Sequence, residues 1–154
     1  MRVLLVGGGC RGLSLTRSLS ADGHAVRVVT RSEERRSEIE AAGGEAWIGD
    51  PDRIGTLRYA LANVTVLLWA LGTVEVADLH GSRLEMMLER TIDTMVRGVI
   101  YEGRAGAEIV ERMCRLNEMP YALLDAAPDD GDAWVAAVRA EIDALLVAER
   151  PTVR

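Results

Sequence analysis

The chain has 154 residues, of which 49% are hydrophobic and 27% are charged, and its formal net charge is −6. This length and balance predict one globular domain with a sizeable core, and the negative charge argues against nucleic acid as a partner. No run approaches the roughly 18 to 20 apolar residues that span a bilayer, and the N-terminus begins as a strand with no signal-peptide pattern. We therefore expect a cytoplasmic protein without a membrane partner.

Cysteine and lysine usage excludes several kinds of chemistry. Cys10 and Cys114 are the only cysteines, too few and too far apart for a disulfide framework or a CxxC metal site, so we expect no bound metal. All 18 basic residues are arginines. Schiff-base chemistry, a Walker-type phosphate lysine and a Tyr-x-x-x-Lys catalytic pair each need a lysine and are therefore excluded.

Along the chain, six short apolar runs alternate with segments of helical period. The runs predict strands at Arg2–Val6, Ala25–Thr30, Glu45–Ile48, Val64–Ala70, Arg97–Tyr101 and Tyr121–Leu124. Strands that alternate with helices in this way favour repeated βα units and a mostly parallel sheet.

End signals place the first three helices. The first spans about 11–21 and ends at Asp22-Gly23, because glycine accepts the left-handed conformation that follows a helix. The second begins near Ser32 and ends at Gly43-Gly44. The third opens with Asp50-Pro51, an N-cap residue followed by proline at the first helical position.

The remaining helices follow the last three strands. The fourth begins with a capping box made by Ser82 and Glu85. Its apolar face consists of Leu84, Met87, Leu88, Thr91, Ile92 and Met95. The fifth helix is predicted at roughly 107–117 and the last at roughly 132–148.

Six strands with crossover helices match the doubly wound dinucleotide-binding sheet, in which the strand order is 3-2-1-4-5-6. We therefore predict an α/β fold: a single Rossmann domain over 1–150, with a six-stranded, mostly parallel sheet covered by helices on both faces. Residues 151–154 are predicted to be a C-terminal tail. No segment remains for a separate substrate domain.

The glycine loop after the first strand has the spacing of a dinucleotide-binding turn. Gly7, Gly9 and Gly12 satisfy G-x-G-x-x-G between a strand and a helix. Gly7 allows the tight turn, Gly9 lets the backbone approach a pyrophosphate, and Gly12 lets the helix pack close to the strand. The helix start offers N–H groups and a positive dipole end to the anion. The same glycines are also compatible with a purely structural turn.

Cys10 and Arg11 occupy variable positions of this loop and are counted with the cofactor-binding residues. A thiolate is stabilised at a helix N-terminus, but no second cysteine lies nearby in sequence, so we interpret Cys10 as a small residue tolerated there. For Arg11 three interpretations stay open: contact with the pyrophosphate, stacking near the adenine, or a position in solvent.

The end of the second strand favours NADP over NAD. An Asp or Glu there grips the ribose hydroxyls of NAD, whereas this chain has Thr30, Arg31 and Ser32. Arg31 can pair with a 2′-phosphate, Ser32 can add a hydroxyl, and Arg35 can add a second positive charge. Two alternatives remain. The arginines at 31, 35 and 36 could form a solvated helix face with Glu33, Glu34, Glu38 and Glu40, or Glu33 could act as a ribose acid.

The run VLLVGGGCRGLSLTRSLSADGHAVRVVTRS, followed by IGDPDRIGTLRYALANVTVLLWALG, resembles the N-terminal half of atypical short-chain dehydrogenase/reductases and their epimerase-like relatives. The matching residues are Gly23-His24, Asp50 and Ala70-Leu71-Gly72, and the resemblance covers roughly the first 72 residues. It implies a Rossmann fold that binds NAD(P), with Asp50 by the adenine and Ala70 and Leu71 by the adenosine ribose and beyond. The family's Tyr-x-x-x-Lys relay is absent, so the resemblance does not extend to its reaction.

Candidate catalytic groups follow from the rule that ligands bind at the carboxyl ends of the strands. The rule selects Asp78 and His80 after the fourth strand, and Tyr101 and Glu102 at the end of the fifth. His80 is either an acid or base or a hydrogen-bonded surface residue. Tyr101 is either a donor to a substrate carbonyl or an aromatic residue packed on a helix.

The leading functional hypothesis is a small NADP(H)-binding Rossmann protein acting as a reductase, with the pocket for a small-molecule substrate completed by a second copy in a homodimer. The alternative is a non-catalytic sensor or regulatory subunit that reports the NADP(H) state. Methyl transfer from adenosylmethionine would need an acid at the end of the second strand, which the chain lacks.

Overall fold

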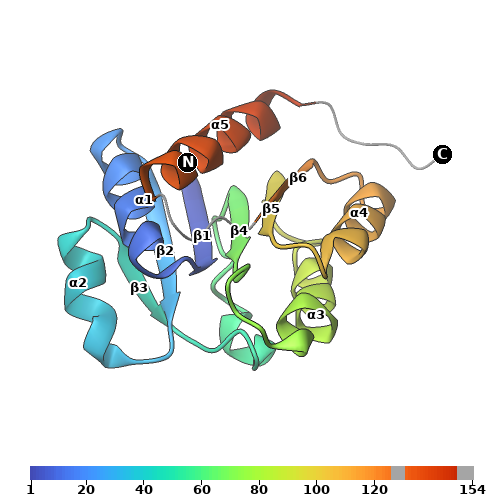
Figure 1. The fold of residues 1–154 in the computed structure, drawn as a ribbon, viewed down its shortest axis with the longest axis horizontal. Helices are drawn as coiled ribbons and strands as arrows, with labels where there is room; N and C mark the ends of the chain where they lie inside the picture. Colours follow the sequence, from blue (N-terminus) through green and yellow to red (C-terminus); the bar gives the residue numbers. More distant parts are fainter. Residues whose placement is uncertain (126–130, 149–154) are drawn as a thin grey trace.

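Six parallel strands form the centre of the protein, in the order β3-β2-β1-β4-β5-β6 (Figure 1). The computed structural model describes residues 1–125 and 131–148. The strands are β1 (Arg2–Gly7), β2 (Ala25–Thr30), β3 (Glu45–Ile48), β4 (Val66–Ala70), β5 (Gly98–Glu102) and β6 (Tyr121–Leu124). The α/β class, the parallel sheet and the strand order are therefore confirmed.

The α-helices are α1 (Gly9–Ala21), α2 (Arg36–Ala41), α3 (Ser82–Arg90), α4 (Ala107–Leu116) and α5 (Gly131–Val147). Three 3₁₀ turns join them: η1 (Glu33–Arg35), η2 (Ile54–Leu57) and η3 (Ala77–His80). Helices α1, α2 and α5 cover one face of the sheet, and α3 and α4 cover the other (Figure 1). No helix within the described residues is long and apolar enough to cross a membrane.

The side chains of successive strand residues point to opposite faces of the sheet and therefore pack into two separate hydrophobic cores. Leu4 and Val6 of β1 pack in the core beneath α3 and α4, whereas Val3 and Leu5 pack in the core beneath α1 and α5. Every residue of β4 and β5 is buried. Nearly continuous apolar runs of this kind are typical of parallel strands covered on both faces.

Burial extends to Glu102, the last residue of β5, whose side chain is completely inaccessible. Glu102, a candidate catalytic group because of its place at the end of the fifth strand, therefore lies inside the protein. Its environment is described with the candidate site below.

The predicted third helix is wrong. Instead of capping a helix, Asp50 Oδ1 accepts a hydrogen bond from the Asp52 N–H at 2.9 Å, and only the 3₁₀ turn η2 follows. The Thr56 hydroxyl contacts the backbone of Asp50 and Arg53. Such local side-chain bonds compete with helix formation, which explains the short turn.

The predicted fourth helix is too long, and its capping box is absent. Gly81 is the N-cap of α3 without a side-chain bond, and Glu85 instead pairs with Arg112 on α4. The helix ends at Arg90 because the Thr91 hydroxyl donates to the Leu88 carbonyl at 2.6 Å. Ile92 and Met95, expected on the buried face, are 50% and 71% exposed.

Other boundaries differ by a few residues. Helix α1 begins at Gly9, two residues early, and the second helical segment is divided into η1 and the six-residue α2. Strand β4 begins at Val66 rather than Val64, and β5 ends one residue later than expected. The predicted tail at 151–154 lies outside the described residues.

Candidate functional site

The glycine loop joins β1 to α1 at the carboxyl edge of the sheet. Gly7 has a φ of +91°, and a Cβ there would lie 2.4 Å from the Ala70 carbonyl oxygen. The next N–H, of Gly8, donates to that same oxygen at 2.9 Å. A Cβ at Gly12 would lie 3.0 Å from a Leu5 methyl carbon and 3.2 Å from the Gly7 carbonyl oxygen. The loop is therefore pressed against the end of β4, and only glycine fits at Gly7.

Gly9 differs from these two positions because its surroundings are open. Its φ is +54°, and no heavy atom lies within 4 Å of the place that a Cβ would occupy. The first N–H groups of a helix have no partner within the helix, and they carry its positive dipole end. The loop thus combines an open approach to the backbone with a helix N-terminus.

Two adjoining clefts lie over this edge. The first, here called the β2 cleft, has a volume of about 540 Å³. The predicted site residues that line it are Gly7, Thr30, Arg31, Ser32, Arg35, Asp50 and Leu71. The second, the loop cleft, has a volume of about 470 Å³ and is lined by residues 7–11 with Ala70, Leu71, Thr73 and Val74. Gly7, Leu71 and Val74 line both, so the two clefts form one groove.

A third cleft continues beyond the loop that follows β4. This β5 cleft has a volume of about 330 Å³, and Gly72, His80 and Arg104 are among its lining residues. It shares Val74 and Val76 with the β2 cleft. Of the predicted cofactor-binding residues, Gly12 alone lines none of the three, because it lies under the loop against Leu5.

Arg31 has an exposed side chain at the mouth of the β2 cleft. Within residues 1–125 and 131–148, its guanidinium makes no hydrogen bond or ion pair. Arg35 lines the same cleft but pairs with Glu38 at 2.5 Å. The Ser32 hydroxyl caps η1 by accepting from the Glu34 N–H at 3.1 Å. The cleft therefore has one cation, on Arg31, that no described side chain neutralises.

The structure supports one of the two alternatives for this segment, the solvated helix face, for Arg36, and does not support the other, Glu33 as a ribose acid. Arg36 pairs with Glu33 and Glu40 on the helix surface, as the solvated-face interpretation expects. The hydrogen bond from Arg36 holds the pKa of Glu33 below its usual value. Strand β2 ends at Thr30 as predicted, and Glu33 does not line the β2 cleft. The geometry therefore offers no support for Glu33 as a ribose acid.

The Arg11 side chain is mostly buried and points toward Glu102 and Trp134. Its guanidinium lies 3.2 Å from Glu102 Oε2 and 4.7 Å from the centre of the Trp134 ring, and 13% of its side chain is exposed. Glu102 also accepts from the Gly72 N–H at 3.0 Å and from the Trp134 indole N–H at 2.6 Å. Arg11, Glu102, Gly72 and Trp134 are called the Glu102 cluster below.

His80 and Tyr101, the two catalytic candidates, bind each other. Tyr101 O–H and His80 Nδ1 are 2.5 Å apart, His80 Nε2 is 2.9 Å from the Val74 carbonyl oxygen, and the Gly106 N–H donates to the Tyr101 hydroxyl at 2.9 Å. A neutral His80 that donates from Nε2 and accepts at Nδ1 satisfies all of these contacts. Tyr101 is completely buried, and this burial raises its pKa.

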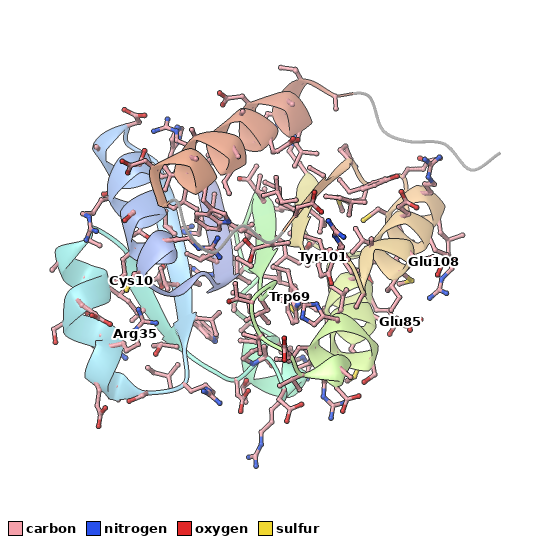
Figure 2. All side chains as sticks on the ribbon, viewed as in Figure 1. Cys10, Arg35, Trp69, Glu85, Tyr101 and Glu108 are labelled. Carbon is pink, nitrogen blue, oxygen red and sulfur yellow. The ribbon has the colours of Figure 1, made fainter. Side chains whose placement is uncertain are left out.

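The cysteines occupy opposite environments. Cys10 is exposed in the loop cleft, whereas Cys114 lies on the buried face of α4, where burial raises its pKa to about 12. Figure 2 shows Cys10 and Arg35 on the side of α1 and α2, and Tyr101 on the side of α3 and α4. Among the described residues, no group of three or more His, Cys, Asp or Glu side chains could hold a metal ion.

Comparisons with known proteins agree on the fold. No protein-family model matches the sequence, and no curated protein matches it in sequence. Among solved structures, the chain matches a triphenylmethane reductase from Citrobacter sp. in complex with NADP(H), with a TM-score of 0.65 and 22% identity, over 82% of this chain and 50% of the reductase. It also matches a UDP-glucuronic acid 4-epimerase variant from Bacillus cereus in complex with a fluorinated sugar nucleotide and NAD, with a TM-score of 0.63 and 12% identity, over 81% of this chain and 56% of the epimerase.

The chain shares a Rossmann-type α/β fold with the matched parts of the reductase and the epimerase. It spans about half the length of the matched reductase and epimerase. A provisionally assigned short-chain dehydrogenase/reductase from Corynebacterium glutamicum is matched over nearly its whole length, with 99% of this chain and 97% of that one, a TM-score of 0.70 and 19% identity. The resemblance drawn from the sequence is thus confirmed for the fold.

Two features of the candidate site were missed from the sequence. Val74 and Val76 line the clefts from the loop after β4, a segment with no residue pattern that marks it. The bond from the buried Trp134 indole to Glu102 also had no signal in the sequence around Trp134. The one available signal was the acid at the end of an otherwise apolar strand.

Proposed function

We propose that the chain binds NADP(H) along the groove formed by the β2 cleft and the loop cleft. The observation that carries the proposal is Arg31, an exposed guanidinium at the cleft mouth with no ion-pair partner in the described part of the chain. A 2′-phosphate is the group that distinguishes NADP from NAD, and an arginine beside the end of the second strand accommodates it.

The residues of the groove fit the rest of the dinucleotide. The open backbone at Gly9 and the N-terminus of α1 suit the pyrophosphate. Asp50 lines the β2 cleft, and one of its oxygens is used by the Asp52 N–H, which leaves the other for a polar group of the adenine. Ala70 and Leu71, at the loop cleft, would lie along the adenosine ribose and the diphosphate.

The residues that follow β2 support a phosphate, and not a ribose hydroxyl, as the group that the β2 cleft recognises. Arg31 and Ser32 stand directly after β2, where an acid would grip the hydroxyls of NAD. Arg35 lies close enough to line the same cleft, but its pairing with Glu38 makes it a weaker contributor than Arg31. We therefore assign phosphate recognition mainly to Arg31.

A bound NADPH would supply a hydride donor, and the β5 cleft would supply room for a small substrate. His80 lines that cleft, but its ring nitrogens are used by Tyr101 and Val74. The Tyr101 hydroxyl is buried and cannot touch a substrate in this conformation. This arrangement favours a second candidate function, a non-catalytic NADP(H) sensor or subunit, over a reductase that uses either residue as its proton donor.

The proposal is tested by calorimetric titration with NADPH and NADH at one fixed salt concentration. Wild type is expected to bind NADPH more tightly, and Arg31→Ala should weaken NADPH by about 10-fold to 100-fold while changing NADH little, since a charge-assisted pair is lost. Arg36→Ala is the matched control, because Arg36 pairs with Glu33 outside the cleft. Equal losses for both nucleotides would remove Arg31 from the phosphate site.

An assay of NADPH oxidation by the wild-type protein distinguishes a reductase from a non-catalytic sensor or subunit. Oxidation of NADPH in the presence of aldehydes, quinones or flavins would identify a reductase. Tight binding of NADPH with no turnover across that panel would support the sensor or subunit.

A further inference from the structure

The side chain of Glu102 is an acid in a position that solvent does not reach. Both of its carboxylate oxygens are fully engaged. Oε1 accepts from Arg11 at 3.4 Å and from the Gly72 N–H at 3.0 Å, while Oε2 accepts from Arg11 at 3.2 Å and from Trp134 at 2.6 Å. An isolated buried carboxylate is strongly unfavourable, so these donors are required for the charge to remain there.

The donors come from three separate segments, and two of these, the start of α1 and the turn after β4, line the loop cleft. Arg11 belongs to the first turn of α1, immediately after the glycine loop. Gly72 follows β4 and begins the loop that carries Val74. Trp134 belongs to α5, and the Arg11 guanidinium lies over its ring at 4.7 Å. One carboxylate therefore fixes the start of α1 relative to the turn after β4.

The contact at Gly72 is close as well as polar. A Cβ there would lie 2.6 Å from Glu102 Cγ and 2.8 Å from Oε1, so the backbone is held directly against the carboxylate. On the other side of the cleft, the glycine loop is held against the Ala70 carbonyl through Gly7 and Gly8. The glycine loop and the turn after β4 are therefore joined in two places: by the contact of the glycine loop with the Ala70 carbonyl, and by Glu102, which binds both Arg11 and Gly72.

We propose that Glu102 is a positioning residue for the dinucleotide, which holds the glycine loop and the β4 turn at the separation that a bound diphosphate needs. The inference rests on the proposed function, because it concerns the same groove. Glu102 acts through Arg11 and Gly72 without touching the ligand. Since the diphosphate is common to NADPH and NADH, loss of Glu102 weakens both equally, in contrast to loss of Arg31.

The first experiment compares Glu102→Gln with wild type by calorimetry. The amide keeps the size of the side chain but removes its charge, and we expect about a tenfold weaker affinity for both NADPH and NADH, with their ratio unchanged. Glu45→Gln is the matched control. It breaks an Arg–Glu pair of similar length, Arg27–Glu45 at 3.3 Å, at the start of β3, and should leave both affinities unchanged.

A spectroscopic readout separates positioning from a general loss of structure. The emission of Trp134 is obtained as the difference between wild type and Trp134→Phe, which keeps an aromatic ring beneath Arg11. Addition of NADP⁺ should change this emission in wild type, because the loop that receives the diphosphate is joined to Trp134 through Arg11. In Glu102→Gln the change should be absent at saturating NADP⁺.

A double variant covers the case in which Glu102→Gln fails to fold. Arg11→Gln combined with Glu102→Gln leaves no unpaired buried charge. If the two side chains act as a pair, the double variant loses no more affinity than either single variant that folds. Additive losses would contradict the pairing.

The outcomes for the two proposals differ. A folded Glu102→Gln that binds both nucleotides as wild type does, or that loses affinity for NADPH alone, overturns the positioning role and leaves the proposed function intact. A wild type that binds neither nucleotide overturns the proposed function, and the positioning role with it.

Discussion

The two halves of the carboxyl edge treat their polar groups in opposite ways. Over β1 and β2, Arg31 has no partner among the described residues, and the open side of Gly9 faces no atom. Over β4 and β5, the hydroxyl of Tyr101, the ring of His80 and the carboxylate of Glu102 are all hydrogen-bonded inside the protein. The same edge of one sheet thus offers a set of unused groups on one side and a set of internal supports on the other.

This difference indicates which polar groups at the edge of the sheet are able to bind a ligand. A group that already has its partners must lose them before it can bind anything, whereas an unpaired cation in a cleft gains by binding an anion. We therefore expect substitutions of side chains that are bonded inside the protein to lower its stability, and substitution of the unpaired Arg31 to act mainly on binding.

The largest effect on stability should come from Arg11→Ala. It leaves Glu102 buried without its cation, so we expect a loss of about 3 to 5 kcal/mol in the free energy of unfolding, measured by urea denaturation. Arg112→Ala is the control, since its pair with Glu85 has the same 3.2 Å distance but 60% of the Arg112 side chain is exposed. That pair should contribute about 0 to 1 kcal/mol. Similar losses for the two variants would refute the contrast between buried and exposed pairs.

The glycine loop gives the next largest effect. Gly7→Ala should destabilise the protein by about 2 to 4 kcal/mol, because φ is +91° and the new methyl group would meet the Ala70 carbonyl oxygen. Gly9→Ala meets no atom and should lose about 1 kcal/mol, from its left-handed backbone alone. Thermal unfolding measures both.

Binding then sharpens the comparison between the two glycines. The Gly9→Ala methyl group would occupy the open side that is proposed for the diphosphate. We therefore expect this mild variant to lose NADPH affinity by more than its stability suggests. Unchanged affinity would mean that the ligand does not approach Gly9.

Tyr101→Phe should lower stability less than Arg11→Ala and Gly7→Ala do. The variant leaves His80 Nδ1 and the Gly106 N–H without a partner. We expect the free energy of unfolding to fall by about 1 to 3 kcal/mol, while the affinity for NADPH stays within about twofold of wild type.

The contribution of Tyr101 to stability should also depend on pH. Burial raises the pKa of Tyr101 in the folded state, so this contribution is complete below the pKa of the unfolded chain, about 10, and is lost as the pH rises through the pKa of the folded protein. The stability gap between wild type and variant should therefore narrow in alkaline solution. A marked loss of NADPH affinity would place Tyr101 in the ligand site.

The strands could be predicted because their signal is local. Three of the six, β2, β3 and β6, have the bounds expected from apolar runs, and glycine spacing placed the loop after β1. The end of β2 at Thr30 then fixed Arg31 and Ser32 at the edge of the sheet, where both line a cleft. Periodicity and turn chemistry suffice for such features, since each depends on neighbouring residues.

The failures involve competition that a local pattern does not reveal. Asp50-Pro51 has the composition of a helix start, yet the hydroxyl of Thr56 binds the same backbone and only a 3₁₀ turn forms. The Ser82 and Glu85 pair is available for capping, but Glu85 faces Arg112 on another helix. Glu102 depends on donors from three distant segments, and no window of sequence contains them.

The separation of those donors along the chain bears on how the protein assembles. The contacts of Glu102 with Arg11, Gly72 and Trp134 span 91, 30 and 32 residues. Contacts between distant residues form late, because long loops must be closed before such pairs can stabilise them. Arg11 and Gly72 precede Glu102 in the chain, whereas Trp134 follows it, so the bond from Trp134 requires the last helix to be in place. Helix α5 therefore completes the burial of the Glu102 carboxylate, and a chain cut short before this helix would leave one of its oxygens without that donor.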